Sequence, residues 1–477
     1  MKFSTTIVSI ALFAGIALAG CELVEVTNPN VTDEVFLETS NSSKTWLNGL
    51  RRQLASTMNQ VVVSTELVSD NYFNNRTLSS KVFDIPQIES YDLDVNNLQK
   101  EIHRLREMAE YGLDRVIPAD KSATDADMAE MLFLKAYAHL LSGELFVALP
   151  GTAGGPVLTP TQHLNEAITG LNAAIAHHPD QEMKQSYTLL KARAYYSLGD
   201  KANAVKYIEE VLANKRLLYQ VKYDGVNGMQ NSMQTFLFSS TYNEFAPLPR
   251  LDFLDPKYFH QTTITADQKP IAIVKAEEAY LILAEAAIAS GDLAGAKQSL
   301  HSLLTEVVSQ RPVVMLNDSK ETRNGGNRTD YPLTEVLVKF DPANEPKEGY
   351  VLDRSLGDIK AYPVSGTKVT TEDIDGISNQ DEALYLLYRL RQEIFFAEGR
   401  RMTDLGIKFP ISETEALNNS HVTAAHQKAQ LPSYIPLGRG MDDFTYDQQT
   451  KVVTMKYDMN QVLVQHKQSP EIFPFIN

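Results

Sequence analysis

The clearest alternation of apolar and polar positions lies in residues 269–307. Apolar and small side chains recur there at helical spacing on both sides of a Gly291-Asp292 step, which is a typical helix-breaking turn. The positions predicted to share the buried faces are Ile273, Ala276, Tyr280, Leu283, Ala284, Ala287, Ala296, Leu300 and Leu303. Because alanines on facing positions allow two helices to approach closely, this stretch predicts a tight helical hairpin.

The same pattern recurs twice upstream. A Gly-Asp turn at Gly199 is followed by Ala204 at the spacing seen in the first hairpin, and a third unit covers residues 128–142 with Gly143 expected at its turn. The second helix of that unit is delayed until after residues 144–161. The three turn glycines stand 56 and 92 residues apart, far from the roughly 34 of a regular tetratricopeptide array. The fold predicted is mainly α, an interrupted tetratricopeptide-type helical scaffold with long loop and short-strand insertions.

Two further helices and two long insertions complete this prediction. Residues 43–65 form the first expected helix, with Trp46, the only tryptophan, interpreted as core. Residues 381–406 form the second strong helix. The insertions at 216–268 and 309–379 are rich in aromatic and turn residues and contain short alternating runs, as does the tail at 443–458, which reads as a hairpin. Function is expected in such insertions, because long loops in a compact chain usually carry it.

The amino-terminal segment predicts export and lipid attachment. Lys2 precedes an apolar run that ends in small residues before Cys21, the only cysteine, and the run is too short to span a bilayer. Leu18-Ala19-Gly20-Cys21 resembles a bacterial lipobox, so we expect cleavage before Cys21 and acylation of that residue, giving a lipid-anchored outer-membrane protein that faces the cell exterior. The predicted organisation is a signal peptide at 1–20, a tether at 21–40 and one domain at 41–477, with an N-terminal half of about 41–268 and a C-terminal part of about 269–477.

Two loop segments are the candidates for ligand binding. The first follows the first helix and combines aromatic, amide and charged side chains, and the second lies in the long aromatic insertion. The candidate contacts are Asp70, Tyr72, Asn74 and Arg76 from the first segment and Tyr242 and Phe245 from the second. The net charge of −16 argues against nucleic-acid binding, which depends on basic side chains that neutralise phosphates.

Metal and catalytic chemistry find little support in the sequence. Residues 92–97 resemble the start of an EF-hand loop, but Asn97 stands where glycine is required and His103 where a bidentate glutamate is required. We interpret this segment as a polar turn that begins a helix. Glu393 and Glu398 are rejected as an acid/base couple because they point to different faces of a helix and nearby arginines keep both ionised. No metal, cofactor or catalytic residue is predicted.

Charge spacing also predicts ion pairs on the second strong helix. Arg389 and Glu393 stand four residues apart, as do Arg400 and Asp404. Side chains at this spacing are neighbours on a helix surface, so each pair is expected to form.

These features together resemble the SusD/RagB family of outer-membrane lipoproteins from Bacteroidetes-type bacteria, over essentially the whole chain. The resemblance lies in the order and spacing of the lipobox at Cys21, Asn28-Pro29-Asn30, Leu134-Lys135-Ala136-Tyr137, Asp255-Pro256-Lys257-Tyr258, the helix at 278–286 with Gly291-Asp292, and Arg391-Gln392-Glu393 leading to Glu398-Gly399-Arg400 and Asp404-Leu405. One departure is the stretch EIFFAEGRR, which has one residue more between its two glutamates than the commoner family form. That departure leaves open which arginines are equivalent.

The resemblance implies a non-enzymatic, surface-exposed protein that binds an oligomeric nutrient, most often a glycan. It also implies a partner, a SusC-like TonB-dependent outer-membrane transporter, with the tetratricopeptide helices as a frame. Two alternatives stay open at this point. A tetratricopeptide lipoprotein that scaffolds outer-membrane assembly is disfavoured by the irregular repeat spacing, and a glycoside hydrolase is disfavoured because no segment nominates a carboxylate pair.

Overall fold

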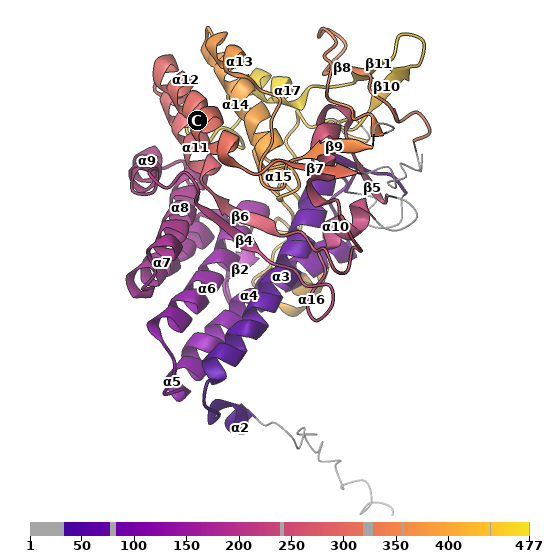
Figure 1. Ribbon diagram of the computed structural model, residues 1–477. Helices are drawn as coiled ribbons and strands as arrows, with labels where there is room; N and C mark the ends of the chain where they lie inside the picture. Colours follow the sequence, from indigo (N-terminus) through magenta and orange to yellow (C-terminus); the bar gives the residue numbers. More distant parts are fainter. Residues whose placement is uncertain are drawn as a thin grey trace, which may run out of the picture.

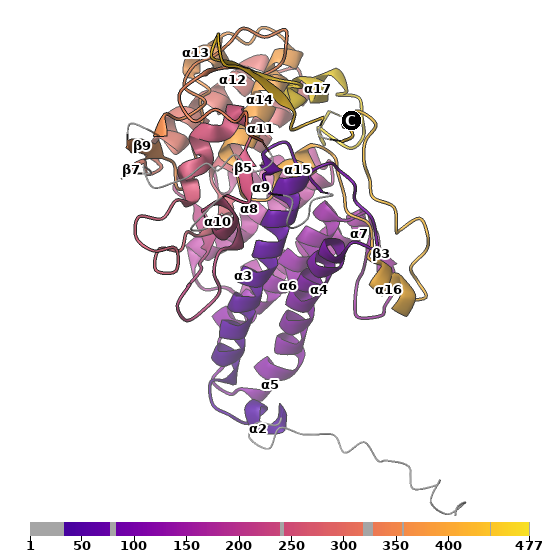
Figure 2. The same cartoon turned by 90° about the vertical axis from the view of Figure 1, so that its right-hand side faces the viewer.

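The computed structural model describes residues 33–76, 83–238, 243–317, 328–354, 357–438 and 440–476. Figure 1 shows α6 to α9, α11 and α12 following one another along one side of the molecule, with short strands and loops at the other side. Helix α3 crosses the molecule diagonally and α4 runs beside it (Figure 2). In the part of the chain that the structure describes, no helix is long and apolar enough to span a membrane.

Helices account for most of the regular structure. Up to the long insertion they are α2 (Asp33–Leu37), α3 (Ser42–Val68), α4 (Leu93–Tyr111), the π-helical turn η1 (Gly112–Val116), α5 (Ile117–Ala119), α6 (Asp125–Leu145), α7 (Pro160–His177), α8 (Gln181–Ser197), α9 (Lys201–Glu209) and α10 (Ser232–Leu237). The later ones are the 3₁₀ helix η2 (Pro249–Tyr258), α11 (Glu277–Ala289), α12 (Leu293–Ser302), the π-helical turn η3 (Leu303–Val307), the 3₁₀ turn η4 (Val308–Gln310), α13 (Thr371–Asp375), α14 (Gln380–Ile394), α15 (Arg401–Asp404), α16 (Glu413–Asn418) and α17 (Met459–Gln465).

The strands are short and form small separate sheets. They are β1 (Tyr72–Asn74), β2 (Leu149–Pro150), β3 (Val157–Leu158), β4 (Leu218–Val221), β5 (Phe245–Pro247), β6 (Ile271–Lys275), β7 (Val314–Asn317), β8 (Leu337–Lys339), β9 (Asp358–Ala361), β10 (Phe444–Asp447) and β11 (Val452–Met455). The antiparallel pairs are β1–β5, β2–β3, β4–β6 and β7–β9, and the order β10–β11–β8 makes a three-stranded sheet. The hairpin predicted in the tail is β10–β11, antiparallel as expected.

The two Gly-Asp turns predicted at Gly199 and Gly291 are present. Gly199 and Gly291 adopt φ values of 73° and 75°, a left-handed conformation that glycine accepts at little steric cost. The aspartates that follow are helix N-caps: Asp200 accepts a hydrogen bond from the Asn203 amide, and Asp292 from the Gly295 amide. The mainly helical, interrupted-hairpin fold is therefore confirmed.

The prediction of a turn at Gly143 is wrong. This residue lies inside α6, which continues to Leu145. A Cβ at Gly143 would stand 2.9 Å from both the Pro160 carbonyl oxygen and Leu164 Cγ on α7. Glycine therefore serves close packing of α6 on α7 here, and sequence spacing alone does not distinguish that role from a turn.

The second strong helix is also shorter than predicted. It breaks after α14, where Ala397 and Gly399 have φ values of 59° and 76°, and the chain resumes helically in α15. The hydroxyl of Tyr258 donates to the Ala397 carbonyl over 2.7 Å, and the Gly399 amide donates to Glu66 Oε1 over 2.7 Å. These long-range bonds satisfy backbone groups that a continuous helix would have paired internally.

The break also changes one predicted ion pair. Arg389 pairs with Glu393 over 3.0 Å as expected. Asp404, however, pairs with Arg391 over 2.7 Å, and Arg400 reaches Glu278 on α11 over 2.7 Å. The spacing of four between Arg400 and Asp404 implied a contact only if both residues lay in one helix.

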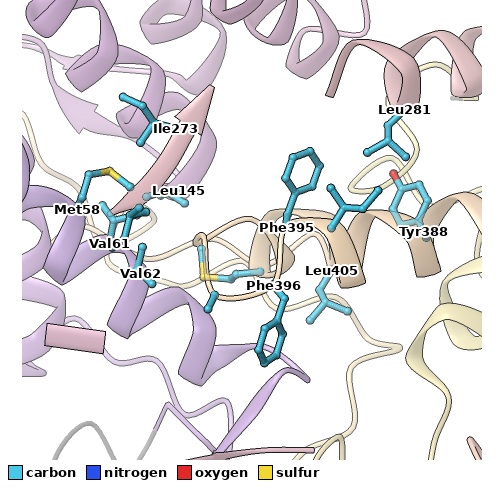
Figure 3. Close-up of a cluster of buried hydrophobic side chains, with 14 of the residues drawn as sticks. Met58, Val61, Val62, Leu145, Ile273, Leu281, Tyr388, Phe395, Phe396 and Leu405 are labelled. Atoms are coloured by element: carbon cyan, nitrogen blue, oxygen red, sulfur yellow. The ribbon is translucent and has the colours of Figure 1, made fainter. Parts of the chain in front are cut away.

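The core is continuous across the two halves of the chain. Figure 3 shows Met58, Val61 and Val62 of α3 close to Ile273 of β6 and, beyond them, side chains of the α14–α15 region. Members of this cluster from both halves are fully or almost fully buried: Met58, Val61, Val62, Leu145, Ile273, Leu281, Tyr388, Phe395, Phe396 and Leu405. Neither half closes its own apolar surface without the other.

Candidate ligand-binding groove

The two segments predicted to bind ligand lie side by side. Strand β1, from the first segment, pairs antiparallel with β5, from the long insertion, so that Tyr72 faces Pro247 and Asn74 faces Phe245. The Asn75 amide extends the ladder by donating to the Glu244 carbonyl over 2.7 Å. Two segments that are about 170 residues apart in sequence are therefore neighbours in the fold. The long insertion lies next to the end of α3 (Figure 1).

Most of the predicted contact residues form the buried base of this region. Asp70 and Tyr72 are 0% exposed and Phe245 is 1% exposed, and Asn74 is also buried. Arg76 is half-buried, and Tyr242 lies outside the described residues, as does Cys21. Because buried side chains offer no surface to a ligand in this conformation, we reassign Asp70, Tyr72, Asn74 and Phe245 from ligand contact to support.

Asp70 shows what this support consists of. Its carboxylate accepts from Arg401 Nε over 2.6 Å, is ion-paired with Arg250, and accepts from Gln392 Nε2 over 3.1 Å. Burial raises the pKa of Asp70, but the guanidiniums of Arg401 and Arg250 outweigh burial and lower that pKa to about 2. The polar residues of the first segment thus fasten β1 to the C-terminal half.

The adjacent aromatic side chains lead from this base to an open groove. The ring of Phe245 stacks on that of Phe236 with centroids 4.8 Å apart. Phe236 is half-buried and lines a groove of about 340 Å³ between α3, α4 and α10. The residues that line this groove are Ser56, Asn59, Gln60, Val63, Asp94, Asn97, Lys100, Glu101, Met229, Ser232 and Phe236.

Helix caps and side-chain bonds hold the groove walls in place. Asp92 caps α4 by accepting from the Asp94 amide over 2.8 Å. Asn59 joins α3 to the start of α10, because its amide donates to the Gln230 carbonyl over 2.8 Å and its oxygen accepts from the Ser232 amide over 2.9 Å. The walls are therefore preorganised, a condition that lowers the entropic cost of binding.

The polar groups of the groove are hydroxyl, amide, carboxylate and ammonium groups beside one aromatic ring. Asn97 and Lys100 are exposed on α4, and Gln60 is half-buried on α3. Glu101 accepts from Gln53 Nε2 over 2.7 Å, which orients its carboxylate. Such a surface can exchange hydrogen bonds with a polyhydroxylated molecule while the Phe236 ring covers an apolar face of it.

Sequence reasoning identified the insertion that supplies Phe236 but missed the helical walls. The available signal was a polar stripe on α4, where Asp94, Asn97 and Glu101 recur at spacings of three and four. The segment caps and begins α4, so its interpretation as a helix start is confirmed.

A second, larger cleft of about 550 Å³ lies between the ends of α6, α7 and α8 and the C-terminal segment. The charged side chains that line this cleft form ion pairs with one another or with neighbouring residues. Glu144 is ion-paired with Arg193, Asp404 with Arg391, and Arg400 with Glu278. Because these groups already satisfy each other, the smaller groove is the better candidate for a polar ligand.

The two glutamates weighed in the sequence as an acid/base couple do not line the groove. Among the residues with assigned structure, no group of three or more His, Cys, Asp or Glu side chains could hold a metal ion. Glu393 is paired with Arg389, and Glu398 accepts from Lys257 Nζ and Lys275 Nζ over 2.6 and 2.9 Å. These two glutamates are elements of buried ion pairs.

The fold matches solved structures whose sequences differ widely from this one. A SusD-like protein from Bacteroides fragilis NCTC 9343 aligns with a TM-score of 0.53 at 12% identity, over 82% of this chain and 98% of its own. A SusD superfamily protein from Parabacteroides distasonis ATCC 8503 gives 0.53 at 12% identity, over 81% and 99%. A SusD-like carbohydrate binding protein from Bacteroides vulgatus ATCC 8482 gives 0.50 at 13% identity, over 75% and 81%. No family profile and no curated protein matches the sequence. The repeat frame, its insertions and these alignments together show that the chain has the SusD-like fold.

Proposed function

We propose that this protein binds an oligosaccharide in the groove between α3, α4 and α10. The observation that carries the proposal is the groove itself, where the Phe236 ring lies beside amide, hydroxyl and carboxylate side chains of α3 and α4. Sugar recognition needs such a pairing of an aromatic face with fixed polar groups. The SusD-like carbohydrate binding protein among the structural neighbours supports the same ligand class.

Binding in this groove requires no chemical step. The carboxylate of Glu101 accepts from Gln53 and lies 3.6 Å from Arg104 Nη1, so these neighbours fix its position in the groove. A carboxylate held in this way accepts hydrogen bonds from sugar hydroxyls. We therefore propose capture and release, without hydrolysis.

We further propose that the protein is anchored by lipid at Cys21 and works with a SusC-like TonB-dependent transporter. The lipobox sequence supports the anchor, and the SusD-like fold supports the partner through the resemblance to the SusD/RagB family. A pull-down of the lipidated protein is expected to recover such a transporter. Recovery of assembly factors alone would favour a scaffold role instead.

Calorimetry with a panel of neutral and acidic oligosaccharides tests the binding proposal. Phe236→Ala and Asn97→Ala are each expected to weaken binding by roughly tenfold, the effect of losing about 1.4 kcal/mol. Asn97 is exposed, so its variant leaves the fold intact and isolates the contact. Thr403→Ala, in the larger cleft, is the matched control and should bind as the wild type does.

Three results would contradict the proposal. Unchanged affinity in both groove variants would remove the groove as the site. A loss confined to Thr403→Ala would move the site to the larger cleft. Release of reducing sugar by the purified protein would show hydrolysis and would end the capture-only interpretation.

A further inference from the structure

One end of the molecule is formed by α2, the start of α3 and α5. Figures 1 and 2 show these elements together, opposite to α13, β10 and β11. The Ser43 amide and hydroxyl donate to Asp120 Oδ2 over 3.0 and 2.6 Å, and the Asn41 amide donates to Ser122 Oγ over 3.2 Å. We call this end the amino-terminal pole.

The pole presents aromatic and aliphatic side chains to the outside. Val35 on α2 is 55% exposed. Phe36, Trp46 and Tyr111 are half-buried and form a continuous row, with ring centroids 6.0 Å apart for Phe36 and Trp46 and 5.0 Å apart for Trp46 and Tyr111. Amphipathic aromatic rings of this kind concentrate at the interface between membrane and water.

Trp46 is held rigidly in this row. Its Nε1 donates to the Met108 carbonyl over 2.8 Å. A Cβ at position 112 would stand 2.9 Å from the indole Cδ1, so Gly112 lets the ring lie flat against the start of η1. The polar end of the indole is therefore already satisfied within the protein, and its remaining surface can contact lipid without leaving a buried donor unpaired.

The pole has no excess of basic groups, since α2 also carries Asp33 and Glu34. Lys44, Arg115 and Lys121 are exposed, and so are Glu38, Asp114 and Asp125. Attraction to anionic lipids requires an excess of basic groups, which this end lacks. The chemistry of the pole fits a zwitterionic lipid surface that accepts apolar and aromatic side chains.

We propose that the amino-terminal pole rests on the membrane surface, with Val35, Phe36 and Trp46 at the level of the lipid headgroups. This inference rests on the proposed lipid anchor at Cys21. Only residues 22–32 separate Cys21 from the start of α2, so the pole stays within about 40 Å of the acyl chains even if that stretch is fully extended.

The same placement determines how far the ligand groove lies from the membrane surface. Trp46 lies in the first turns of α3, whereas Ser56, Gln60 and Val63 of the groove lie in its second half. Fourteen residues of helix separate Trp46 from Gln60, or about 21 Å at 1.5 Å per residue. A pole that touches the membrane would therefore hold the ligand groove clear of the lipid headgroups.

Tryptophan fluorescence tests the inference directly, because Trp46 is the only tryptophan in the chain. The full-length lipidated protein is placed in phosphatidylcholine vesicles whose acyl chains carry bromine close to the headgroups, and in vesicles brominated near the bilayer centre. The expected result is a loss of Trp46 fluorescence that is larger with the shallow bromines. Val35→Asp should reduce this loss, since it puts a charge on the surface that meets the lipid.

Leu417→Asp is the matched control. Leu417 is 80% exposed on α16, far along the chain from the pole, so this change should leave the quenching unaltered. Mass spectrometry of the amino terminus separates the two proposals. A lipidated protein without shallow quenching, or with equal effects of the two aspartates, overturns the placement while the anchor stands. Absence of lipid at Cys21 overturns the anchor and the placement with it.

Discussion

Charged side chains inside this protein are paired across long sequence separations. Arg311 Nε donates to Glu277 Oε1 over 2.8 Å, and Lys275 reaches Glu398 over 2.8 Å. Burial lowers the pKa of Lys275 to about 8, although Glu398 opposes the change. Such pairs add little net stability, but removing one partner leaves an uncompensated buried charge. Their value is specificity, because only one arrangement of the helices satisfies all of them.

Two buried histidines contact each other inside the helical frame. The Nδ1 atoms of His139 and His163 lie 2.9 Å apart, and His163 Nε2 lies 2.9 Å from the Leu149 carbonyl oxygen. A carbonyl only accepts, so His163 donates through Nε2 and its Nδ1 must accept from His139 Nδ1–H in the neutral pair. Burial, together with the positive charge of Arg106, lowers the pKa of His139 to about 3 and that of His163 to about 4.

Acidification should therefore destabilise the helical frame. The folded pKa values lie below the unfolded value, so the unfolded chain binds more protons, and stability is complete above about pH 6.5 and lost as the pH falls toward 4. At pH 5 the loss is on the order of 2 kcal/mol for each histidine. Urea unfolding between pH 7.5 and 5 measures it. A variant with His139→Gln and His163→Gln should take up about two fewer protons on unfolding at pH 5, and an unchanged proton uptake would show that other groups dominate.

At the scale of single elements, capped turns determine where the repeat helices begin. Gly291 reverses the chain with a positive φ, and Asp292 then satisfies the Gly295 amide of α12 over 2.8 Å. The same arrangement at Gly199 and Asp200 starts α9. Both turns are local, because the glycine and the aspartate act on residues within four positions of themselves.

Removing one cap should have a small and measurable cost. Asp292→Ala leaves the Gly295 amide without its acceptor and is expected to lower the free energy of unfolding by about 1 kcal/mol. Denaturant unfolding of the variant measures this. Gln298→Ala, at an exposed position on the same helix, is the control and should change stability by less than about 0.5 kcal/mol. An equal loss in both variants would mean that the cap bond is not responsible.

The α14–α15 break shows the opposite case, an element decided by distant contacts. The local sequence pattern favours one helix through 381–406. Tyr258 and Glu66, from other parts of the chain, instead form hydrogen bonds with backbone groups of this segment. The glutamates of α11 follow the same rule. Glu277, Glu278 and Glu285 are all buried, where they contact Arg311, Arg400 and Tyr196, which lie far away in sequence.

At the scale of the whole molecule, the described residues of the two halves share one buried core. Asp70 and Glu66 of the first half meet Arg401 and the Gly399 amide of the second, and the cluster in Figure 3 spans both. A chain cut after residue 268 would leave Asp70 buried without Arg401 and would expose the apolar face of α3.

The fragment 33–268 is therefore expected not to fold on its own, whereas the whole chain should unfold in one transition. Near-ultraviolet circular dichroism during thermal unfolding measures both, since it reports fixed aromatic packing. A cooperative transition in the isolated fragment would contradict this expectation and would establish two domains.

The sequence by itself determined the helical repeat frame, the capped turns at Gly199 and Gly291 and the tail hairpin, because each depends on residues close together in the chain. It also led to the segments around β1 and β5, which pair with each other but do not line the groove. Tertiary structure decided which of their side chains reach the surface, because exposure depends on partners that lie far away in sequence. Asp70 is a plausible ligand residue until Arg250 and Arg401 enclose it, and the groove exists only because α10 packs beside α3 and α4.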